Sequence, residues 1–446
     1  MELTNKKILI LGMAKSGYAA AKVLARTNQV IVNDSNKNQP PKQIEKLKTL
    51  GVKVVLGAHP DKLFDQTYDY LIKNPGIPLN HKYIQKAYQF KIPVINEIEV
   101  AYHFLPKDIF IIGITGTNGK TTTATLIYKI LKKANLPVHL TGNIGTPLCD
   151  FIRKIKKGDI VIIELSIQQL LNISSFKTNL SVLTNLSEAH LDFISDYHDY
   201  IKGKLGVFNK HAYQEVAILN GDDINVVNNA IKIQSMKKYF SSQRKADCYL
   251  ADGIIYYRQN PVITVSDIKI SGIHNYENVM AAILVVKELK IKNAAIRQVL
   301  KEFKGIEHRV EYVDVIKGIE IYNDSKATNI KSTQTALKLF NKPIILLLGG
   351  LDRGQNFYDL TPYLNNVKLL IGYGACKGRI KEYAGKIKWP SKIVSTLKDA
   401  LKIGIQQGKE GDIILLSPAS ASLDQFKNMA ERGQKFKEYV KEIKEE

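Results

Sequence analysis

The sequence predicts an α/β protein of three domains, and three observations favour this class. Apolar runs typical of buried parallel strands recur along the chain, each followed by a turn and a helical pattern. These strand–turn–helix units form three successive groups. The length of 446 residues also suits about two to four domains. We expect a Rossmann-like first domain (1–98), a central phosphate-loop ATPase-type domain with a mainly parallel sheet (99–305), and a Rossmann-like, doubly wound third domain (306–446).

The first group opens like a dinucleotide-binding fold. An apolar strand leads into the turn Gly12-Met-Ala-Lys-Ser-Gly17, an Ala-rich helix follows, and a second strand ends at Asp34. Alanine replaces the middle glycine of the GxGxxG fingerprint, so the motif alone is a weak signal. A nicotinamide-binding domain, a nucleotide-sugar-binding domain and a Rossmann-like fold with an empty turn all fit. Residues 69–78 add a strand and a Pro-Gly turn at the sheet edge where ligands bind in such folds.

The stretch IFIIGITGTNGKTTT (109–123) carries the strongest chemical signal in the chain. A buried strand precedes a glycine-rich turn, and a helical pattern follows Lys120 and Thr121. Such a turn directs backbone N–H groups at phosphates, the lysine adds positive charge, and the threonine hydroxyl can ligate magnesium. Ile114 stands where the longer GxxxxGK[ST] loop begins with glycine, so this is the shorter TGTNGKT form. An ordinary glycine-rich turn is the alternative, and the Gly-Lys-Thr triplet at the strand–helix junction disfavours it.

Two further strands of the central group end in side chains that suit a metal ion. The strand DIVIIE ends in Glu164, and the strand 180–185 precedes His190. Both are candidate magnesium contacts, direct or through water, because side chains just past these strands lie beside bound phosphates. A structural polar residue is the alternative for either one. Farther along, Asn275 and Asn278 lie three apart at the start of a long helix, where Asn275 could equally be a helix cap.

Polar side chains also follow the strands of the third group. One strand runs into Asn323, Asp324, Ser325 and Lys326. Other strand ends carry Arg353, Ser417, Ser422 and Asp424. In a doubly wound sheet these residues gather at the carboxyl edge, which is the usual ligand site.

The net charge of +22 allows three interpretations: nucleic-acid binding, lysines covering solvated faces, and attraction of anionic small substrates. The lysines are spread over the whole chain, without a basic tail, zinc-finger spacing or an aromatic-flanked basic stripe. This distribution disfavours nucleic acid, and we expect no nucleic-acid partner. The third interpretation suits an enzyme that uses nucleotides.

The cysteines and the apolar runs bear on the compartment. Cys149, Cys248 and Cys376 are far apart and form neither a metal-ligand spacing nor a disulfide framework, which favours a reducing compartment. The N-terminal apolar stretch is shorter than a signal peptide, and no run approaches a membrane span. We therefore expect a cytoplasmic protein without membrane insertion.

Taken together, the motifs resemble those of the Mur ligase family of peptidoglycan synthesis. The resemblance covers nearly the whole chain. It includes GMAKSG and NPGIP, then TGTNGKTTT, GNIG, ELS…Q, TNLSEAHLD and HNYEN, and finally EHR, NDSKATN, GGLDRG and SPASASLDQF. NDSKATN and SPASASLDQF are similar to the branch that adds D-glutamate. The resemblance implies three domains that serve a UDP-sugar substrate, ATP and the incoming amino acid.

The resemblance further implies an ATP-dependent amide ligase. ATP phosphorylates the alanyl carboxylate of UDP-N-acetylmuramoyl-L-alanine, the amine of D-glutamate attacks the acyl phosphate, and the tetrahedral intermediate collapses to an amide, ADP and phosphate. The implied cofactors are ATP and Mg2+, with one or two ions and Mn2+ as a substitute, and we expect a monomer. A sister Mur ligase, a folylpolyglutamate-type synthetase with another amino acid, and a nucleotide- or nucleic-acid-binding module without ligation stay open as alternatives.

Site residues follow from the same resemblance. The implied catalytic residues are Lys120, His190, Lys204 and Lys326. ATP is expected to contact Gly116, Thr117, Asn118, Gly119, Lys120, Thr121, Thr122, Asn275, Asn278, Arg309 and Asp324. The metal is expected on Thr121, Glu164, His190 and Lys204, the last as an anionic carbamate, with Lys202 as the alternative alignment. The UDP-substrate residues are Lys15, Ser16, Asp34, Gly76, Asn143 and Gln169. The D-glutamate residues are Thr328, Arg353, Ser422 and Leu423.

Overall fold

The apolar run KILIL forms the central strand of the first sheet. In the computed structural model, which describes residues 2–188, 194 and 196–446, this sheet has the order β3-β2-β1-β4-β5, and every pair is parallel. Its strands are β1 (Lys7–Leu11), β2 (Gln29–Asp34), β3 (Lys53–Leu56), β4 (Tyr70–Lys73) and β5 (Val94–Ile95). The helices are α1 (Lys15–Leu24), α2 (Pro41–Thr49), the 3-10 turn η1 (Asp61–Leu63) and α3 (Lys82–Gln89). All strands therefore end at one edge, as in a Rossmann-like fold.

The second sheet has the order β14-β13-β12-β11-β10-β9-β6-β8-β7, and only the β12–β13 and β13–β14 pairs are antiparallel among its described strands. Its strands are β6 (Phe110–Thr115), β7 (Val138–Gly142), β8 (Ile160–Glu164), β9 (Leu180–Leu183), β10 (Val216–Asn220), β11 (Met236–Ser241), β12 (Cys248–Ala251), β13 (Ile254–Tyr257) and β14 (Asn260–Thr264). The phosphate-loop strand β6 lies between β8 and β9, so three strand ends meet beside the loop.

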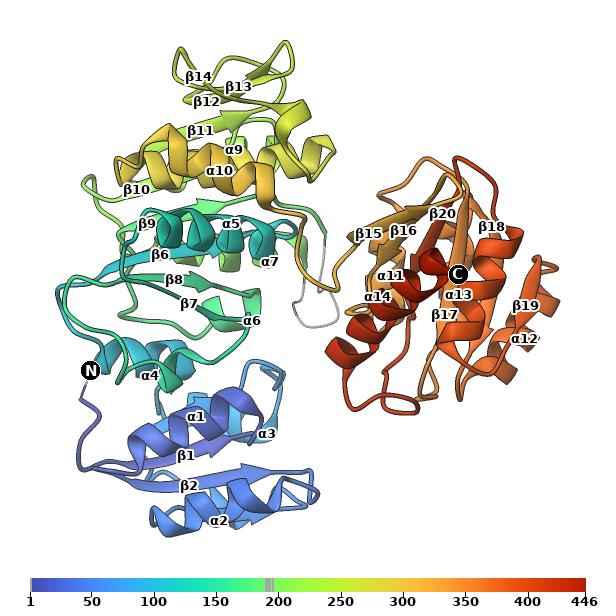
Figure 1. Cartoon of the computed structure of the whole chain (residues 1–446). Coiled ribbons are helices and arrows are strands. Elements are labelled where there is room, and N and C mark those ends of the chain that lie inside the picture. Colours follow the sequence, from blue (N-terminus) through green and yellow to red (C-terminus); the bar gives the residue numbers. More distant parts are fainter. Residues whose placement is uncertain (1, 189–193, 195) are drawn as a thin grey trace. The chain divides into compact units, whose positions relative to one another are not determined.

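Helices cover both faces of the second sheet (Figure 1). They are α4 (Glu97–Phe104), α5 (Lys120–Lys133), α6 (Ile167–Leu170), α7 (Tyr197–Leu205), α8 (Ile224–Asn229), α9 (Ile273–Glu288) and α10 (Asn293–Glu302). Short 3-10 turns are η2 (Leu148–Asp150), η3 (Gly206–Phe208), η4 (Ala230–Lys232) and η5 (Val265–Asp267). Helix α9 packs against α5 and is buried along its whole middle part, Asn278 to Val286, which explains its apolar sequence.

The third sheet has the order β15-β16-β20-β17-β18-β19, and only the β15–β16 pair is antiparallel among its described strands. Its strands are β15 (Glu311–Ile316), β16 (Ile319–Asn323), β17 (Ile344–Gly349), β18 (Val367–Tyr373), β19 (Ser391–Ile393) and β20 (Ile413–Leu416). Its helices are α11 (Ile330–Leu337), η6 (Phe357–Tyr363), α12 (Lys377–Lys386), α13 (Leu397–Gln407) and α14 (Met429–Glu445). Alternate residues of β17 and β20 enter two separate apolar cores, one on each face, as a doubly wound sheet requires.

The chain separates into two compact units, Met1–Phe303 and Lys304–Glu446. The first two sheets share one unit because a single apolar cluster continues from α1 to the residues beneath the second sheet. An ion pair between Lys22 and Asp150 (2.7 Å) also joins these parts. The three sheets confirm the predicted α/β class, whereas the predicted boundary at residue 98 stays a prediction.

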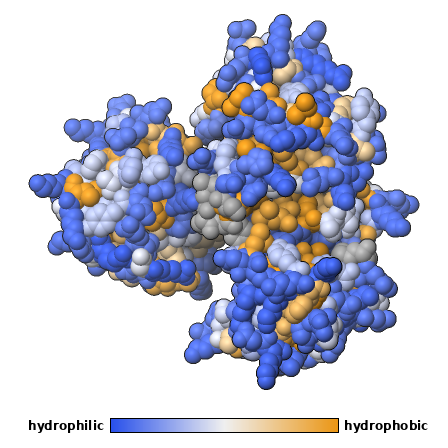
Figure 2. All heavy atoms as spheres, turned by 180° about the vertical axis from the view of Figure 1, so that it is seen from behind, coloured by the Kyte–Doolittle hydropathy of each residue, from blue (hydrophilic) through white to orange (hydrophobic). Residues whose placement is uncertain are grey.

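The surface agrees with a chain rich in charged residues. Figure 2 shows hydrophilic side chains over most of the visible face of each unit, with hydrophobic patches between them. Within the described part of the chain, no helix is both long enough and apolar enough to cross a lipid bilayer.

Candidate active site

The phosphate loop connects β6 to α5 through two glycines with positive φ, Gly116 at +136° and Gly119 at +80°. L side chains rarely adopt these values, and a Cβ atom at either position would meet a neighbouring side chain, that of Thr184 or of Asn278. Helix α5 begins at Lys120, directly after the second glycine. The glycines are therefore required both by the turn and by the close approach of two other segments.

Segment 184–187, which follows β9, holds the loop from one side. The backbone N–H groups of Thr117 and Asn118 donate to the carbonyl and the side-chain oxygen of Asn185, at 2.9 and 2.8 Å. The Thr117 hydroxyl lies 2.9 Å from the hydroxyl of Tyr200, which is fully buried on α7. Lys120 reaches back over the loop, and its Nζ donates to the carbonyls of Gly116 and Thr117 at 2.9 and 2.7 Å. The ammonium group thus lies where it could meet a phosphate.

Glu164 ends β8 and is paired in register with Ile114 of β6. Its carboxyl group is buried, with 2% of the residue exposed. One oxygen, Oε1, accepts a bond from Asn143 Nδ2 at 2.9 Å, while Oε2 is buried without a hydrogen-bond partner among the described residues. A buried carboxylate oxygen with no partner costs free energy, and a bound cation removes that cost. This oxygen is therefore chemically suited to bind a hard cation.

Lys204 lies on α7 and is also 2% exposed, whereas Lys202 on the same helix is exposed. The Nζ atom of Lys204 donates to Thr115 Oγ1 at 3.2 Å and lies over the Tyr200 ring. Burial holds the pKa of Lys204 well below its usual range, with Lys120 adding to this effect and Glu164 opposing it. The structure therefore brings Lys120, Glu164 and Lys204 into one electrostatic neighbourhood and favours a neutral amine at Lys204. His190, the remaining predicted member of this group, lies outside the described residues.

The two asparagines of α9 have different environments. Asn278 is 6% exposed, accepts a bond from Thr123 Oγ1 at 3.3 Å and lies against Gly119, so it packs beneath the phosphate loop. Asn275 donates through Nδ2 to the carbonyl of Ser271 at 2.9 Å, and the cap position belongs to Gly272. The interpretation of Asn275 as a helix cap is therefore wrong, because its amide binds a carbonyl rather than a free N–H group.

The predicted UDP-substrate residues of the first sheet lie at its carboxyl edge. Asp34 accepts bonds from the backbone N–H groups of Met13 (2.6 Å) and Asn36 (2.8 Å), so it fixes the GMAKSG turn. Lys15 and Gly76 are exposed, and Ser16 is half-buried.

Two other predicted UDP-substrate residues are engaged in local structure of the second sheet. Asn143 is exposed, and its side chain binds Glu164. Gln169 is 3% exposed, and its Oε1 accepts a bond from Ser166 N at 2.9 Å within a capping box at the start of α6.

The third sheet presents its predicted residues above a buried polar framework. Lys326, Thr328, Arg353 and Leu423 are exposed, as is Arg309, whereas Ser422 is 3% exposed. Beneath them, Asp324 accepts bonds from Ser417 Oγ at 2.7 Å and Val310 N at 3.2 Å. Burial raises the pKa of Asp324 to about 7, although the bond from Ser417 opposes the shift.

Arg432 is a residue that sequence reasoning missed. It lies on α14 with 0% exposure, and its guanidinium donates to Ser325 Oγ (2.9 Å), Ser325 O (2.8 Å), Ser420 O (3.0 Å) and Gly349 O (3.4 Å). It therefore ties together the last residue of β17 and the segments that follow β16 and β20. The available signal was its spacing, because Arg432, Phe436 and Val440 recur every four residues and share the buried face of the helix.

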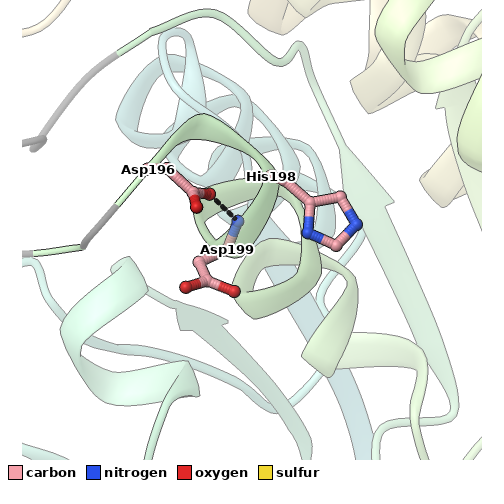
Figure 3. Close-up of side chains that lie close together, drawn as sticks. All are labelled: Asp196, His198 and Asp199. Atoms are coloured by element: carbon pink, nitrogen blue, oxygen red, sulfur yellow. Dashed lines mark hydrogen bonds between the residues drawn. The ribbon is translucent and has the colours of Figure 1, made fainter.

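Asp196, His198 and Asp199 also lie close together, at the start of α7 (Figure 3). Their ligand atoms lie within 4.8 Å of one another, and the group is solvent-accessible. Asp196 caps the helix by accepting a bond from Asp199 N at 2.8 Å. Because capping explains this arrangement, we assign no metal to it.

Comparison with known proteins gives consistent results along the chain. Three family models match: the Mur ligase MurD-like N-terminal domain over residues 6–96, the Mur ligase middle domain over 114–286, and the Mur ligase glutamate ligase domain over 308–420. The chain is 41% identical over 445 residues to the UDP-N-acetylmuramoylalanine--D-glutamate ligase of Geobacillus kaustophilus, covering 99% of this chain and 98% of that one. It is 39% identical over 446 residues to the ligase of the same name from Bacillus mycoides, covering 99% of each.

Solved structures agree on the fold. The UDP-N-acetylmuramate-alanine ligase MurC of Thermotoga maritima matches with a TM-score of 0.57 and 17% identity, covering 99% of this chain and 100% of that one. The MurF ligase of Thermotoga maritima, in complex with ADP, matches with a TM-score of 0.57 and 15% identity over the same shares.

Proposed function

This chain belongs to the Mur ligase family, and we propose that it is the ATP-dependent ligase that adds D-glutamate to UDP-N-acetylmuramoyl-L-alanine in peptidoglycan precursor synthesis. The observation that carries the chemistry is the group at the edge of the second sheet. There, a phosphate loop, a buried carboxylate with an unpartnered oxygen and a buried lysine converge. A binding module without ligation has no need for such a costly arrangement.

The reaction requires activation of a carboxylate, which is a poor electrophile because its negative charge is delocalised. Transfer of the γ-phosphoryl group of ATP forms an acyl phosphate and releases ADP. The amine of D-glutamate then attacks the carbonyl carbon, the C–N bond forms, and phosphate leaves. Lys120 stabilises the charge that develops on the phosphates, and the turn Gly116, Thr117, Asn118, Gly119 with Thr121 and Thr122 surrounds them.

The residues present also fit the cation that such a reaction uses. Oε2 of Glu164 and the hydroxyl of Thr121 would hold Mg2+, with His190 as a further contact, and bound magnesium would supply positive charge to the phosphate oxygens. One or two ions are compatible with this set, and Mn2+ is an alternative.

Lys204 is proposed to act as a carbamate. A neutral amine attacks CO2, an N–C bond forms, one proton leaves to solvent, and the product is an anion able to bind a cation. The depressed pKa of Lys204 supports this role, because it favours the neutral amine that the attack requires.

The remaining assignments are also proposals. Asn275, Asn278, Arg309 and Asp324 serve ATP, and Lys326 serves the transferred phosphoryl group. Lys15, Ser16, Asp34, Gly76, Asn143 and Gln169 serve the UDP-sugar. Thr328, Arg353, Ser422 and Leu423 serve D-glutamate, whose carboxylates suit the Arg353 guanidinium. We further propose a cytoplasmic monomer without a nucleic-acid partner.

The decisive experiment measures the release of phosphate from ATP in the presence of Mg2+ and UDP-N-acetylmuramoyl-L-alanine. D-glutamate, L-glutamate, L-alanine and diamino acids are added in turn. We expect release with D-glutamate alone. Release with a different amino acid would move the protein to a sister ligase and overturn the third-domain assignments. A folded, ATP-binding protein that releases phosphate with none of them would overturn ligase activity.

A further inference from the structure

Two turns lie side by side at the carboxyl edge of the first sheet. One follows β1 and contains Gly12, Lys15 and Ser16, and the other follows β4 and contains Asn74 and Gly76. Strands β1 and β4 are parallel neighbours, with Leu11 in register with Lys73. The two turns together therefore carry half of the residues proposed above for the UDP-sugar.

The turns are in direct contact. Asn74 N donates to the carbonyl of Leu11 at 3.0 Å, and Asn74 is 8% exposed. Gly12 has a φ of +94°, and a Cβ atom there would lie 2.8 Å from Cβ of Asn74. A displacement of the second turn would therefore move the first one as well.

Lys73 is the last residue of β4 and is buried, with 1% of its surface exposed. Its Nζ donates to the carbonyls of Pro75 at 3.1 Å and Asn74 at 3.3 Å. Burial lowers the pKa of Lys73 to about 8, so the side chain still carries its charge at neutral pH. Keeping a charge at a buried site is costly, and here the charge is directed at the backbone of the turn.

We propose that Lys73 is a positioning residue for the UDP-sugar substrate. Its ammonium group fixes the carbonyls of Asn74 and Pro75, and thereby holds the second turn against the Gly12 turn. Both turns then offer a preformed surface to the nucleotide part of the substrate, which lowers the entropic cost of binding. The inference rests on the proposed function, because it concerns the binding of that substrate. It adds a residue that does not contact the substrate itself.

The test compares Lys73→Met with wild type and with Lys7→Met. Methionine keeps an unbranched apolar chain and removes the ammonium. Lys7 is the matched control because it is a half-buried lysine at the opposite, amino-terminal end of the neighbouring strand β1, with its Nζ 4.4 Å from the centre of the Tyr68 ring. Calorimetry measures the Kd of UDP-N-acetylmuramoyl-L-alanine, and steady-state kinetics measure each KM and kcat.

We expect Lys73→Met to raise the Kd and the KM for the UDP-sugar about tenfold, the loss typical of charge-assisted hydrogen bonds. The KM for ATP, the KM for D-glutamate and kcat at saturation should stay within about twofold of wild type, because the second and third sheets, which carry the residues proposed for ATP and D-glutamate, are untouched. Lys7→Met should leave all of these constants near wild type. A merely structural role of Lys73 would instead lower the melting temperature without this selective change.

Each outcome decides between the alternatives. A folded Lys73→Met variant with wild-type affinity overturns the role of Lys73 and leaves the proposed function intact. Wild-type protein that does not bind the UDP-sugar overturns both. If Lys73→Met does not fold, Lys73→Gln, which keeps an uncharged donor on a shorter side chain, is measured in the same way: a selective rise in the KM for the UDP-sugar supports the inference, and an unchanged KM overturns it.

Discussion

The second and third sheets both carry candidate site residues at their carboxyl edges, yet they expose them very differently. At the second sheet three of the residues proposed for the chemistry are themselves buried: Glu164 and Lys204 are each 2% exposed, and Thr121 is 5% exposed. At the third sheet Lys326 and Arg353 are exposed, and Leu423 is 54% exposed. The buried polar residues there, Asp324 and Arg432 among them, lie beneath the exposed ones.

This difference separates two tasks. At the second sheet, burial lowers the pKa of Lys204, a group proposed for the chemistry, because its charged form loses hydration. Buried Arg432 at the third sheet supports the shape of a binding surface, because it donates to the hydroxyl and carbonyl of Ser325 and to the carbonyls of Gly349 and Ser420, at three strand ends. Substitutions at the second sheet should therefore change the rate of reaction, whereas substitutions of the exposed groups proposed for D-glutamate at the third sheet should change the binding of that substrate.

The largest effect is expected for Lys120→Ala. Turnover should fall by roughly 10²-fold or more, because the variant lacks the cation that faces the phosphates. The melting temperature should stay near wild type, and Lys132→Ala, an exposed lysine near the end of the same helix, should retain activity. Near-normal phosphate release by Lys120→Ala would refute the assignment of the phosphate loop.

The next effect distinguishes two lysines of one helix. Lys204→Ala should lower activity roughly 10-fold to 100-fold, because a ligand to the cation is lost. Lys202→Ala should stay near wild type, since that side chain is exposed and outside the buried group. Both variants are compared by phosphate release at several Mg2+ concentrations. Equal losses of activity in the two variants would contradict the assignment of the effect to the buried lysine, Lys204.

Glu97 is a buried carboxyl group without a role in the proposed chemistry, so its substitution tests how burial alone affects stability. It is 2% exposed, accepts a bond from Cys149 N, and has an Oε2 atom without a hydrogen-bond partner among the described residues. Burial raises the pKa of Glu97 to about 7 from 4.5, so the folded protein keeps a proton that the unfolded chain releases. The stability contributed by this group is complete below about pH 4.5 and is lost as the pH rises through 7.

We therefore expect wild-type protein to lose up to about 3 kcal/mol more stability between pH 5 and pH 8 than Glu97→Gln. Urea unfolding of the first two sheets at both pH values measures the difference, with Glu45→Gln as the exposed carboxyl control. Parallel pH profiles for wild type and Glu97→Gln would show that this carboxyl group does not stay protonated in the fold.

The smallest effect is expected for the exposed Arg353. Arg353→Ala should raise the KM for D-glutamate roughly tenfold and change the melting temperature little, because one charge-assisted contact is lost. The KM for ATP should be unchanged. The control Lys381→Ala removes an exposed cation of α12, and it should match wild type in both KM values and in melting temperature. A rise in the KM for ATP of similar size would contradict the separation of tasks between the two sheets.

The phosphate loop was predictable because its information is contiguous: strand, glycines, Lys120 and helix follow one another within 109–123. The same holds for Glu164 at the end of an apolar strand. Lys73 and Arg432 were not recognised as special, since a charged residue in a sequence normally indicates a solvated face. The alternative of a helix cap at Asn275 was wrong, because the cap position depends on the exact start of α9, which Gly272 precedes.

The order of apolar runs, glycine turns and helical patterns was thus enough to establish an α/β chain with three sheets, because hydrophobic period and turn chemistry are local properties. The motifs were enough to indicate the family. The fold alone showed that Lys204 rather than Lys202 is buried, that Glu164 keeps an oxygen without a partner, and that Lys73 holds a turn. Burial and hydrogen bonding depend on segments that are distant in the chain, and these segments meet only when the sheets have formed.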